Sequence, residues 1–471
     1  MLILYGIAVL VAVLVVNTLI QTRSARKLTA AGPTDIDAAA DYAQKLQRMI
    51  RCRTVSRKNE YDDAEFAKLR AEVENLFPLL HTKAERMIFS EDCWVYRLPG
   101  RDASRNIMLM SHHDVVAAQG GWKHDPFAGE TAEGKIWGRG TVDTKTPLFA
   151  EFAALEELLQ EGFVPACNVY LASSHNEELG GDGIPKALAH FIEHGISFEV
   201  ILDEGGAVID PPLGGMKCEK CAMVAVHEKG RWKLRCTAPA VPGHASLTRA
   251  TRATPTERMA SFIHEITVKP GFVRRLNPQV MAMFTHLAPY CGFAMKLLFS
   301  NLWLFGPLLR RIMPKLNAQA GGMIGTTCAF YELHSDDRGC TATVMLRSVD
   351  EADMHQDIET LKAVARKYAV EVEQMEDSEY HGPADMTAPA FDYTMDCIAK
   401  VFPQYPAAPF ILPAGTDARH FTDICPAVLR FAPIRLSSQQ LASVHGEDEN
   451  IDVTAVAEAV TFYKSFVRNY H

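Results

Sequence analysis

The sequence lacks an excess of basic residues. Lys and Arg together number 48 against 57 Asp and Glu, so the formal net charge is -9. A chain that repels phosphate overall is a poor candidate for binding nucleic acid, and we expect no nucleic-acid partner. The sequence also lacks internal repeats and low-complexity tracts. Their absence excludes solenoid, collagen-like and wholly disordered chains.

Cysteine is thinly spread and shows no pairing pattern. The 11 cysteines are an odd number scattered over 471 residues, without the density of a disulfide-stapled secreted module, so a reducing compartment fits better. Cys218 and Cys221 have the spacing of a metal knuckle, but no second pair follows at zinc-ribbon distance. We interpret them as ordinary thiols near a domain junction.

One long hydrophobic run is present, at the amino end. Residues 2–20 contain no charge and a single Asn, and about 20 apolar residues suffice to cross a bilayer. Arg23, Arg26 and Lys27 follow the run, whereas a cleavable signal would have a basic start and a small-residue exit site. We therefore expect a single-pass membrane anchor over residues 2–20 and a linker over residues 21–34. By the positive-inside rule, the bulk of the chain would lie on the cytoplasmic side.

A second apolar stretch covers residues 287–309. Lys296, Asn301 and two prolines interrupt it, so we interpret it as a buried or surface-lying helix pair and not as another membrane span.

The remaining chain alternates short apolar runs with amphipathic segments. Residues 106–110, 168–172 and 198–202 are apolar without alternation, as in strands that are buried on both faces. Residues 148–159 and 184–192 have helical spacing between them. This order predicts an α/β domain with a mostly parallel central sheet.

The middle of the chain has a different pattern. Residues 224–226 and 232–236 flank Gly230 and predict a hairpin. The segment also contains a helix with Thr254 as its cap and Pro255 in its first turn, a second hairpin from residues 327–333 and 341–346, and a helix over residues 353–368. We expect an inserted α+β domain over residues 215–380, within a first domain formed by residues 35–214 and 381–471.

Each of the three buried strands leads directly into side chains that can bind metal. The first ends at His112, His113 and Asp114, the second at His175, Glu177 and Glu178, and the third at Asp203 and Glu204. Because ligands bind outside the carboxyl ends of strands in open α/β sheets, we expect these side chains to converge. Imidazole and carboxylate without thiolate suit zinc, cobalt or manganese. Of two adjacent acids, one can bind metal while the other accepts a proton from water.

The motifs match a known family in their order along the chain. They are His112-x-Asp114, Gly138-Arg139-Gly140 with Asp143, Asn176-Glu177-Glu178, Asp203-Glu204-Gly205, Pro242-Gly243-His244, Arg347, Gly415-Thr416-Asp417 and His445-Gly446-Glu447. Over about residues 40–468 the chain resembles the M20 metallopeptidases, which include aminoacylases, dipeptidases and carboxypeptidases. It is most similar to the carboxypeptidase S branch, which contains N-acyl amino acid amidohydrolases.

The resemblance implies a role for each matching position. Asp143 would bridge two zinc ions, with cobalt or manganese as substitutes; His112 and Asp203 would complete one ion, and Glu178 and His445 the other. Glu177 would be the general base and acid, Asp114 would orient His112, and His244 of the inserted domain would stabilise the oxyanion. Arg347 and the backbone near Gly415 would hold a substrate carboxylate. His113 is the alternative to His112 as ligand.

The resemblance also implies an architecture and an activity. It implies a zinc-peptidase-like catalytic domain, an inserted lid or dimerisation domain, and a possible homodimer formed through that domain. We expect a hydrolase that cleaves an amide next to a free carboxylate in a peptide or N-acyl amino acid. The alternatives are an aminopeptidase and a non-catalytic binding protein on the same fold. The sequence departs from the family pattern at Thr144, where an acid is usual, and over residues 333–340, where the usual Asn is missing.

Overall fold

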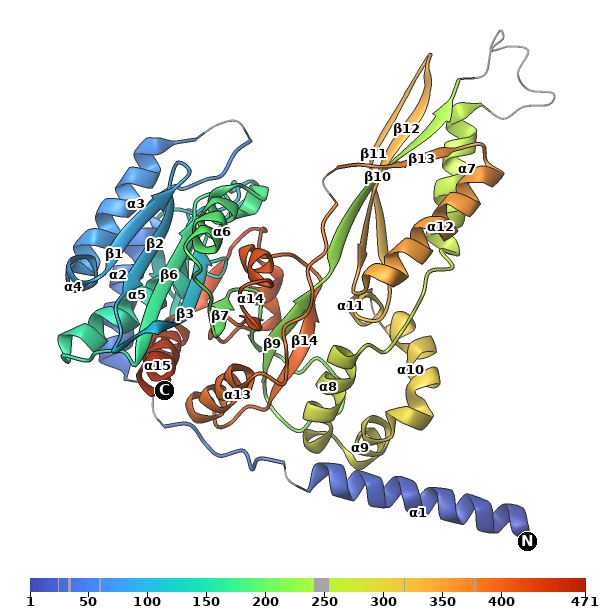
Figure 1. Ribbon diagram of the computed structural model, residues 1–471, viewed down its shortest axis with the longest axis horizontal. Coiled ribbons are helices and arrows are strands. Elements are labelled where there is room, and N and C mark those ends of the chain that lie inside the picture. The colour runs from blue at the N-terminus through green and yellow to red at the C-terminus, as the bar shows by residue number, and fades with distance from the viewer. Residues whose placement is uncertain (24, 33–34, 59–60, 241–253, 317, 377) are drawn as a thin grey trace.

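The computed structural model describes residues 1–471 except 24, 33–34, 59–60, 241–253, 317 and 377, and it describes no side chains for residues 316–319. Figure 1 shows a large sheet with its helices, a smaller sheet beside it, and α1 (Leu2–Thr22) along one edge.

A nine-stranded sheet forms the centre of the larger part. Its strands are β1 (Glu85–Phe89), β2 (Cys93–Leu98), β3 (Asp102–His112), β6 (Cys167–Ser174), β7 (Val200–Asp203), β8 (Ala207–Ile209), β9 (Cys221–Glu228), β14 (Ala407–Leu412) and β15 (Ala427–Arg430). The order is β1-β2-β6-β3-β7-β15-β9-β14, with β8 paired to β9. The three strands predicted from apolar runs are confirmed as β3, β6 and β7.

The expected mostly parallel sheet is corrected to a mixed one. The central strands β6, β3, β7 and β15 are parallel, but β1, β2, β8 and β9 add antiparallel pairs around them. The physical reason is in the connections, because β1 and β2 are joined by a tight turn at residues 90–92, and only antiparallel strands can be joined in that way.

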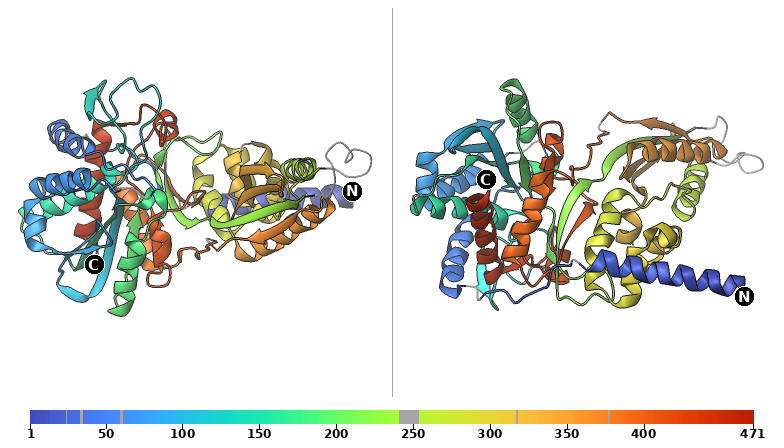
Figure 2. Two further views of the ribbon diagram at one scale, coloured as in Figure 1. Left: turned by 90° about the horizontal axis from the view of Figure 1, so that it is seen from above. Right: turned by 60° about the horizontal axis from the view of Figure 1, so that its bottom comes forward.

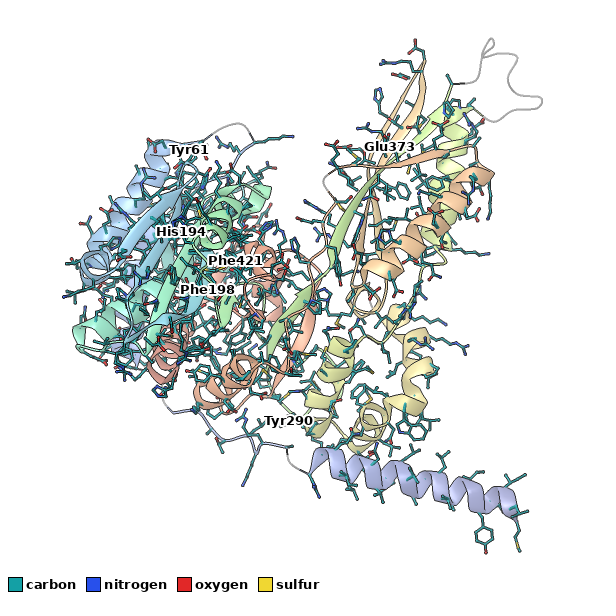
Figure 3. The ribbon with its side chains drawn as sticks, viewed as in Figure 1. Tyr61, His194, Phe198, Tyr290, Glu373 and Phe421 are labelled. Carbon is teal, nitrogen blue, oxygen red and sulfur yellow. The ribbon has the colours of Figure 1, made fainter. Side chains whose placement is uncertain are left out.

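Helices cover both faces of this sheet (Figures 1 and 2). They are α2 (Ile36–Ile50), α3 (Asp63–Leu76), α4 (Pro78–Lys83), α5 (Lys145–Gln160), α6 (Gly183–Glu193), α13 (Pro389–Val401), α14 (Ser438–Ala442) and α15 (Val453–Asn469). Alternate residues of β3 enter different cores: Ile107 packs with α2, α5 and α15, whereas Met108 packs with α6. Figure 3 labels Phe198 and Phe421, which lie in the second core with ring centroids 6.4 Å apart.

The hairpin predicted around Gly230 is wrong. β9 pairs with β14 in the large sheet, and β10 (Gly230–Pro239) pairs with β12 (Gly339–Ser348) in a different, four-stranded sheet. The chain passes from one sheet to the other at Lys229. Two apolar runs around a glycine fix the strands but not their partners, which depend on distant residues. The domain limits stay a prediction, with β9 belonging to the larger sheet.

The four-stranded sheet belongs to the inserted α+β part. It has the order β11-β12-β10-β13, with β11 (Thr327–Asp336) and β13 (Glu371–Gln374) as its outer strands. β11 and β12 form the second predicted hairpin. α7 (Pro255–Val268) and α12 (Glu351–Lys367) pack on the sheet, and Thr254 caps α7 as expected. The role of this part as a lid or dimerisation domain stays a prediction.

Four short helices connect the two parts: α8 (Pro278–Leu287), α9 (Phe293–Ser300), α10 (Leu302–Leu316) and α11 (Ala318–Gly322). α8 packs against β14, and the apolar residues of α8–α10 share a core with β9 and β14. The helix pair expected over residues 287–309 is therefore confirmed as α9 and α10. α1 is long and apolar enough to cross a membrane by length and composition, and its function as an anchor stays a prediction.

Candidate metal centre

His112 is the last residue of β3 and faces the carboxyl edge of the sheet. Its Nε2 lies 2.8 Å from Oδ1 of Asp143. His113, one residue later, faces the opposite side, where its ring stacks on Trp94 at 4.0 Å and its Nδ1 bonds to Ser173. Because successive strand residues alternate between faces, only one of the two histidines can reach the site. The geometry favours His112.

Asp143 lies between two histidines. Its second oxygen, Oδ2, is 3.0 Å from Nε2 of His445, which is also 3.1 Å from Oε2 of Glu178. His112, Asp143 and Glu178 each offer a ligand atom within 4.8 Å of the others. The other oxygen of Glu178, Oε1, is buried without a hydrogen-bond partner among the described residues. Imidazoles and carboxylates with a buried free oxygen fit a zinc-type ion.

The expected ligand Asp203 is turned away from this cluster. Its two carboxylate oxygens accept the backbone N–H groups of Glu204 at 2.8 Å and Ala418 at 2.9 Å. Glu204 instead lines the cavity that contains Asp143, Glu178 and His445. Burial and the Asp143 charge raise the pKa of Glu204 well above its ordinary value. Glu204 is therefore a second candidate for the fifth ligand, and the assignment of Asp203 stays a prediction.

Asp114 holds together the strand end and the loop that carries the two glutamates. Its carboxylate lies 3.2 Å from Nδ1 of His112 and accepts the backbone N–H groups of Glu177 and Glu178, each at 3.2 Å. Burial opposes ionisation of Asp114, but hydrogen bonds from His112 and Ser56 keep its pKa below the ordinary value. These contacts support the role predicted for Asp114, which is to orient His112.

Glu177 lies beside the cluster without entering it. It is the first residue of a 3₁₀ turn over Glu177–Leu179 and lines the same cavity as Asp143 and Glu204. Burial raises the pKa of Glu177 well above its ordinary value, and the charge of Asp417 adds to this. A carboxyl group with a raised pKa beside a metal-type cluster suits a general base and acid.

A charged cavity of about 330 Å³ opens on one side of the cluster. Glu177, His445, Gly415 and Arg347 all line it. Arg347 comes from β12, and among the described residues its guanidinium has no ion pair or hydrogen bond. Burial and the neighbouring cation Arg231 lower its pKa. An unpaired guanidinium in a cavity is suited to bind a carboxylate.

A second cavity, of about 400 Å³, adjoins the charged cavity at the cluster. Its walls are largely apolar and include Leu412, Ile434, Leu436, Leu441 and Val444. The two cavities share Glu177, Glu178, Ala414, Gly415 and His445. Glu178 and His445 of the metal-type cluster therefore border both a charged and an apolar cavity.

His244, the predicted oxyanion residue, lies outside the described residues together with Pro242 and Gly243. The structure thus leaves its role as a prediction.

A model of the peptidase family M20/M25/M40 matches residues 108–469. The chain belongs to this family. The resemblance expected from the sequence is confirmed, and the homologues and structural neighbours of this M20 peptidase are hydrolases.

Two relatives illustrate the range of named activities. The chain is 29% identical to "Probable carboxypeptidase S-like 2" of Dictyostelium discoideum, covering 97% of this chain and 91% of the relative. It is 27% identical to the human "N-fatty-acyl-amino acid synthase/hydrolase PM20D1", covering 90% of this chain and 87% of the relative.

Solved structures of the family share the fold. An M20 metallo-carboxypeptidase from Sulfolobus solfataricus has a TM-score of 0.65 at 16% identity, covering 91% of this chain and 98% of that one. Human carnosine dipeptidase 1 has a TM-score of 0.64 at 13% identity, covering 92% and 96%. A Bacillus subtilis M20 peptidase described as binding a dinuclear metal has a TM-score of 0.56 at 10% identity, covering 91% and 98%.

Glu449 is a site residue of this M20 peptidase that sequence reasoning missed. It is fully buried and accepts the backbone N–H groups of Val142 at 2.8 Å and Asp143 at 3.1 Å. Arg139 donates to Glu449 at 2.6 Å and to the carbonyl of Gly446 at 2.8 Å. The pair therefore ties the Asp143 loop to the segment that carries His445. The available signal was an acid close behind the His445-Gly446-Glu447 motif.

Metal loading of the metal-free M20 peptidase should release protons. Hydrogen bonds to Asp143 and Glu178 raise the pKa of His445 to about 10, so its imidazole is protonated at neutral pH. A histidine must be neutral to bind metal, so protons compete with the metal for His445. Metal affinity should therefore fall by about tenfold for each unit by which the pH is lowered, for each proton released. A titration with zinc in a weakly buffered indicator solution measures the release.

The matched variants for this titration are His445→Ala and His264→Ala, because His264 is exposed on α7. We expect fewer protons from the first and the parent number from the second. Equal release from all three proteins would contradict the assignment of His445.

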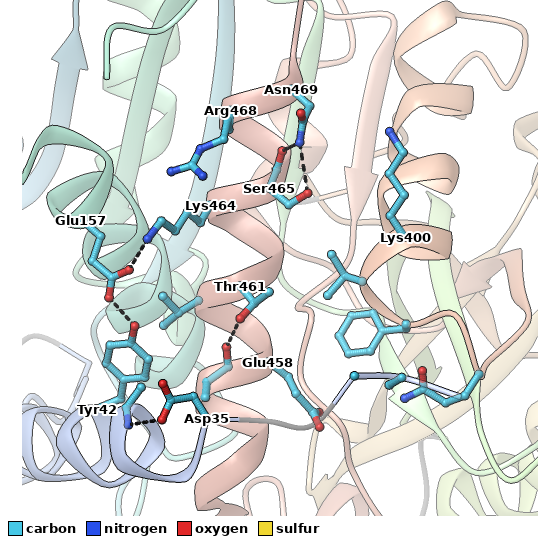
Figure 4. A pocket seen from close by; sticks show the side chains of 18 residues that line it. Asp35, Tyr42, Glu157, Lys400, Glu458, Thr461, Lys464, Ser465, Arg468 and Asn469 are labelled. Atoms are coloured by element: carbon cyan, nitrogen blue, oxygen red, sulfur yellow. Dashed lines mark hydrogen bonds and ion pairs between the residues drawn. The ribbon is translucent and has the colours of Figure 1, made fainter. Parts of the chain in front are cut away.

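A larger cavity of about 700 Å³ lies away from this site, between the linker, α13 and α15 (Figure 4). Tyr42 and Lys464 bind Glu157 on its wall. None of the residues that hold the metal-type cluster lines it, so we assign the chemistry to the two smaller cavities.

Proposed function

We propose that this M20 peptidase is a di-metal hydrolase that cleaves an amide bond next to a free carboxylate. His112, Asp143, Glu178 and His445, together with Asp203 or its neighbour Glu204, would hold two ions, zinc in the first place and cobalt or manganese as substitutes. The observation that carries the proposal is Arg347, whose guanidinium has no ion pair or hydrogen bond within the described part of the chain and which lines the same cavity as Glu177 and His445.

The ions, when bound, lower the pKa of water and polarise a carbonyl group. Glu177 then accepts a proton from the attacking water and returns it to the leaving amine. Burial raises the pKa of Glu177 above its ordinary value, and a carboxyl group with a raised pKa is a stronger base than an exposed one. Asp114 acts through His112 and through the two glutamate N–H groups, so it is a positioning residue.

Arg347 and the Gly415 backbone would bind the substrate carboxylate. Glu228 fixes this loop by accepting the N–H of Thr416 at 3.0 Å and by pairing with Arg430 at 2.6 Å. A Cβ on Gly415 would lie 3.3 Å from Glu228 Oε2, so the loop packs closely against this acid. The backbone beside the cavity is therefore held rigidly.

The apolar cavity would receive the group on the other side of the scissile bond. A dipeptide would place a charged amino group near Leu436 and Leu441, whereas an N-acyl amino acid would place a hydrocarbon chain there. Each buried methylene contributes about 0.8 kcal/mol. We therefore favour N-acyl amino acids with apolar acyl groups as substrates, and peptides with an apolar residue in this position next.

Replacement of Arg347 by Met tests the proposal. A charged hydrogen-bond pair contributes about 1.5–3 kcal/mol, so we expect kcat/KM for an N-acyl amino acid to fall by about 10–200-fold. The same compound with its carboxylate amidated should be a poor substrate for the parent. Its kcat/KM should fall little further in the Arg347→Met protein. Both effects are measured by steady-state rates of the two proteins with each N-acyl amino acid and with its C-terminal amide.

The exposed Arg366→Met on α12 is the matched control and should keep the parent rates. The aminopeptidase alternative predicts instead that acetylation of a peptide abolishes cleavage and that amidation does not. A non-catalytic binding protein would hydrolyse none of these compounds after metal loading.

A further inference from the structure

α1 is fastened to the inserted helices by polar contacts. Asn17 donates to the carbonyl of Ser300 at 2.7 Å and to Oδ1 of Asn301 at 3.0 Å. Asn301, which is fully buried, donates to Thr18 Oγ1 at 3.1 Å. Behind the helix, Tyr290 donates to the carbonyl of Arg26 at 3.1 Å (Figure 3). Removal of α1 would take the Thr18 hydroxyl and the Leu14 carbonyl from the Asn301 amide nitrogen and leave it the carbonyl of Leu297 in α9 at 2.7 Å. This loss of partners argues that α1 is retained.

The position of these contacts along α1 determines how close α9 and α10 lie to a bilayer that contains α1. Residues 2–13 are exposed, and burial against α9 begins at Leu14. At 1.5 Å per residue the free part is about 18 Å long, which is less than the about 30 Å of a bilayer core. Figures 1 and 2 show α1 beside α9 with its N-terminus projecting away from the body. A bilayer that holds α1 must therefore also reach α9 and the start of α10.

The exposed surface of α9 and α10 beside α1 has a composition that suits contact with a bilayer. Phe293 on α9 is 59% exposed, and Trp303 and Leu308 on α10 are 61% and 49% exposed. Arg310 and Arg311 follow on α10, and neither has an ion pair among the described residues. An exposed apolar helix face with a Trp and neighbouring cations is typical of helices that lie in a membrane interface.

We propose that α1, α9 and α10 form one membrane-contact surface, with a bilayer containing anionic lipids as its partner. α1 enters the hydrocarbon, Trp303 and Leu308 lie at the boundary of headgroups and acyl chains, and Arg310 and Arg311 contact lipid phosphates. This inference is independent of the proposed reaction, because none of these residues lines the two cavities beside the metal-type cluster.

Tryptophan quenching by brominated lipid tests the proposal on the full-length protein. The protein is reconstituted into vesicles of phosphatidylcholine and phosphatidylserine with and without bromine on the acyl chains. Of the other four tryptophans, Trp94, Trp137 and Trp232 are at most 8% exposed. Trp122 is half-buried and lies against Arg139 beside the metal-type cluster, away from α9 and α10, so these four form a background that is common to the parent and the variant. We expect clear quenching in the parent and its loss in Trp303→Phe. Equal fractional quenching in both proteins would overturn the proposal.

A pair of surface variants extends the test. Leu308→Asp should reduce the quenching of Trp303, whereas Leu333→Asp, at an exposed position on β11 in the four-stranded sheet, should leave it unchanged. Full quenching in Leu308→Asp would count against the surface. Intact mass of the protein purified from membranes must include α1, and a chain that begins after Thr22 would rule out the joint surface. Unchanged hydrolysis of a soluble substrate shows that the variants are folded.

Discussion

Replacement of Glu177 by Gln is expected to lower kcat by about 10²–10⁴-fold, the range for loss of a general acid–base group. Gln keeps the size of the side chain but cannot accept a proton from water. Because Glu177 lies beside the metal-type cluster and is not one of its members, the variant should bind the same amount of metal as the parent. Single-turnover rates and metal analysis of the same preparation measure the two properties separately.

The exposed Glu193→Gln on α6 is the matched control, with unchanged rates expected. A Glu177→Gln protein that hydrolyses as fast as the parent would remove Glu177 from the mechanism. A variant that loses both metal and activity would show instead that Glu177 is a ligand.

Replacement of Asp143 by Asn should abolish activity by removing metal binding. One carboxylate oxygen faces His112 at 2.8 Å and the other faces His445 at 3.0 Å, so this residue serves both halves of the cluster. Residues behind the ligands alter metal affinity by about 10–100-fold, and a shared ligand should exceed that. Metal content after dialysis should fall close to zero. The rise in Tm that zinc gives the parent should disappear, because a ligand at 100 times Kd stabilises a protein by about 2.7 kcal/mol.

Asp396→Asn, an exposed change on α13, controls for the loss of one negative charge. Normal metal content in Asp143→Asn would contradict the shared role. Loss of folding is distinguished by circular dichroism of the metal-free proteins, which should match.

The central strands and their ends were predictable from the sequence because each signal is local. Residues 106–110, 168–172 and 198–202 are apolar runs; β3 and β6 contain the first two, and β7 begins within the third, at Val200. The rule that ligands gather at the carboxyl ends of strands then predicted that His112 and Glu178 lie close together. The clearest agreement is at Asp143, which no strand pattern singles out and which the family motif supplied.

The errors share a physical cause, since each depends on contacts between distant segments. The false hairpin at Gly230 arose because β9 and β10 are both apolar, while their partners β14 and β12 come from far along the chain. Asp203 and Glu204 are equally acidic neighbours. The backbone N–H of Ala418, from a distant loop, binds Asp203, whereas Glu204 lines the cavity, so the choice of ligand between these two acids stays a prediction. The role of Glu449 likewise depends on the distant Asp143 loop.

The passage of the chain between two sheets at Lys229 has a consequence for substrate length. The metal-type cluster is built on the nine-stranded sheet, whereas Arg347 belongs to the four-stranded sheet. A molecule that touches both must match the separation between two independently packed bodies. Rotation of one body relative to the other about Lys229 would change the distance between Arg347 and the metal-type cluster. It would thus change the length of substrate that fits, while the groups that perform the reaction stay the same.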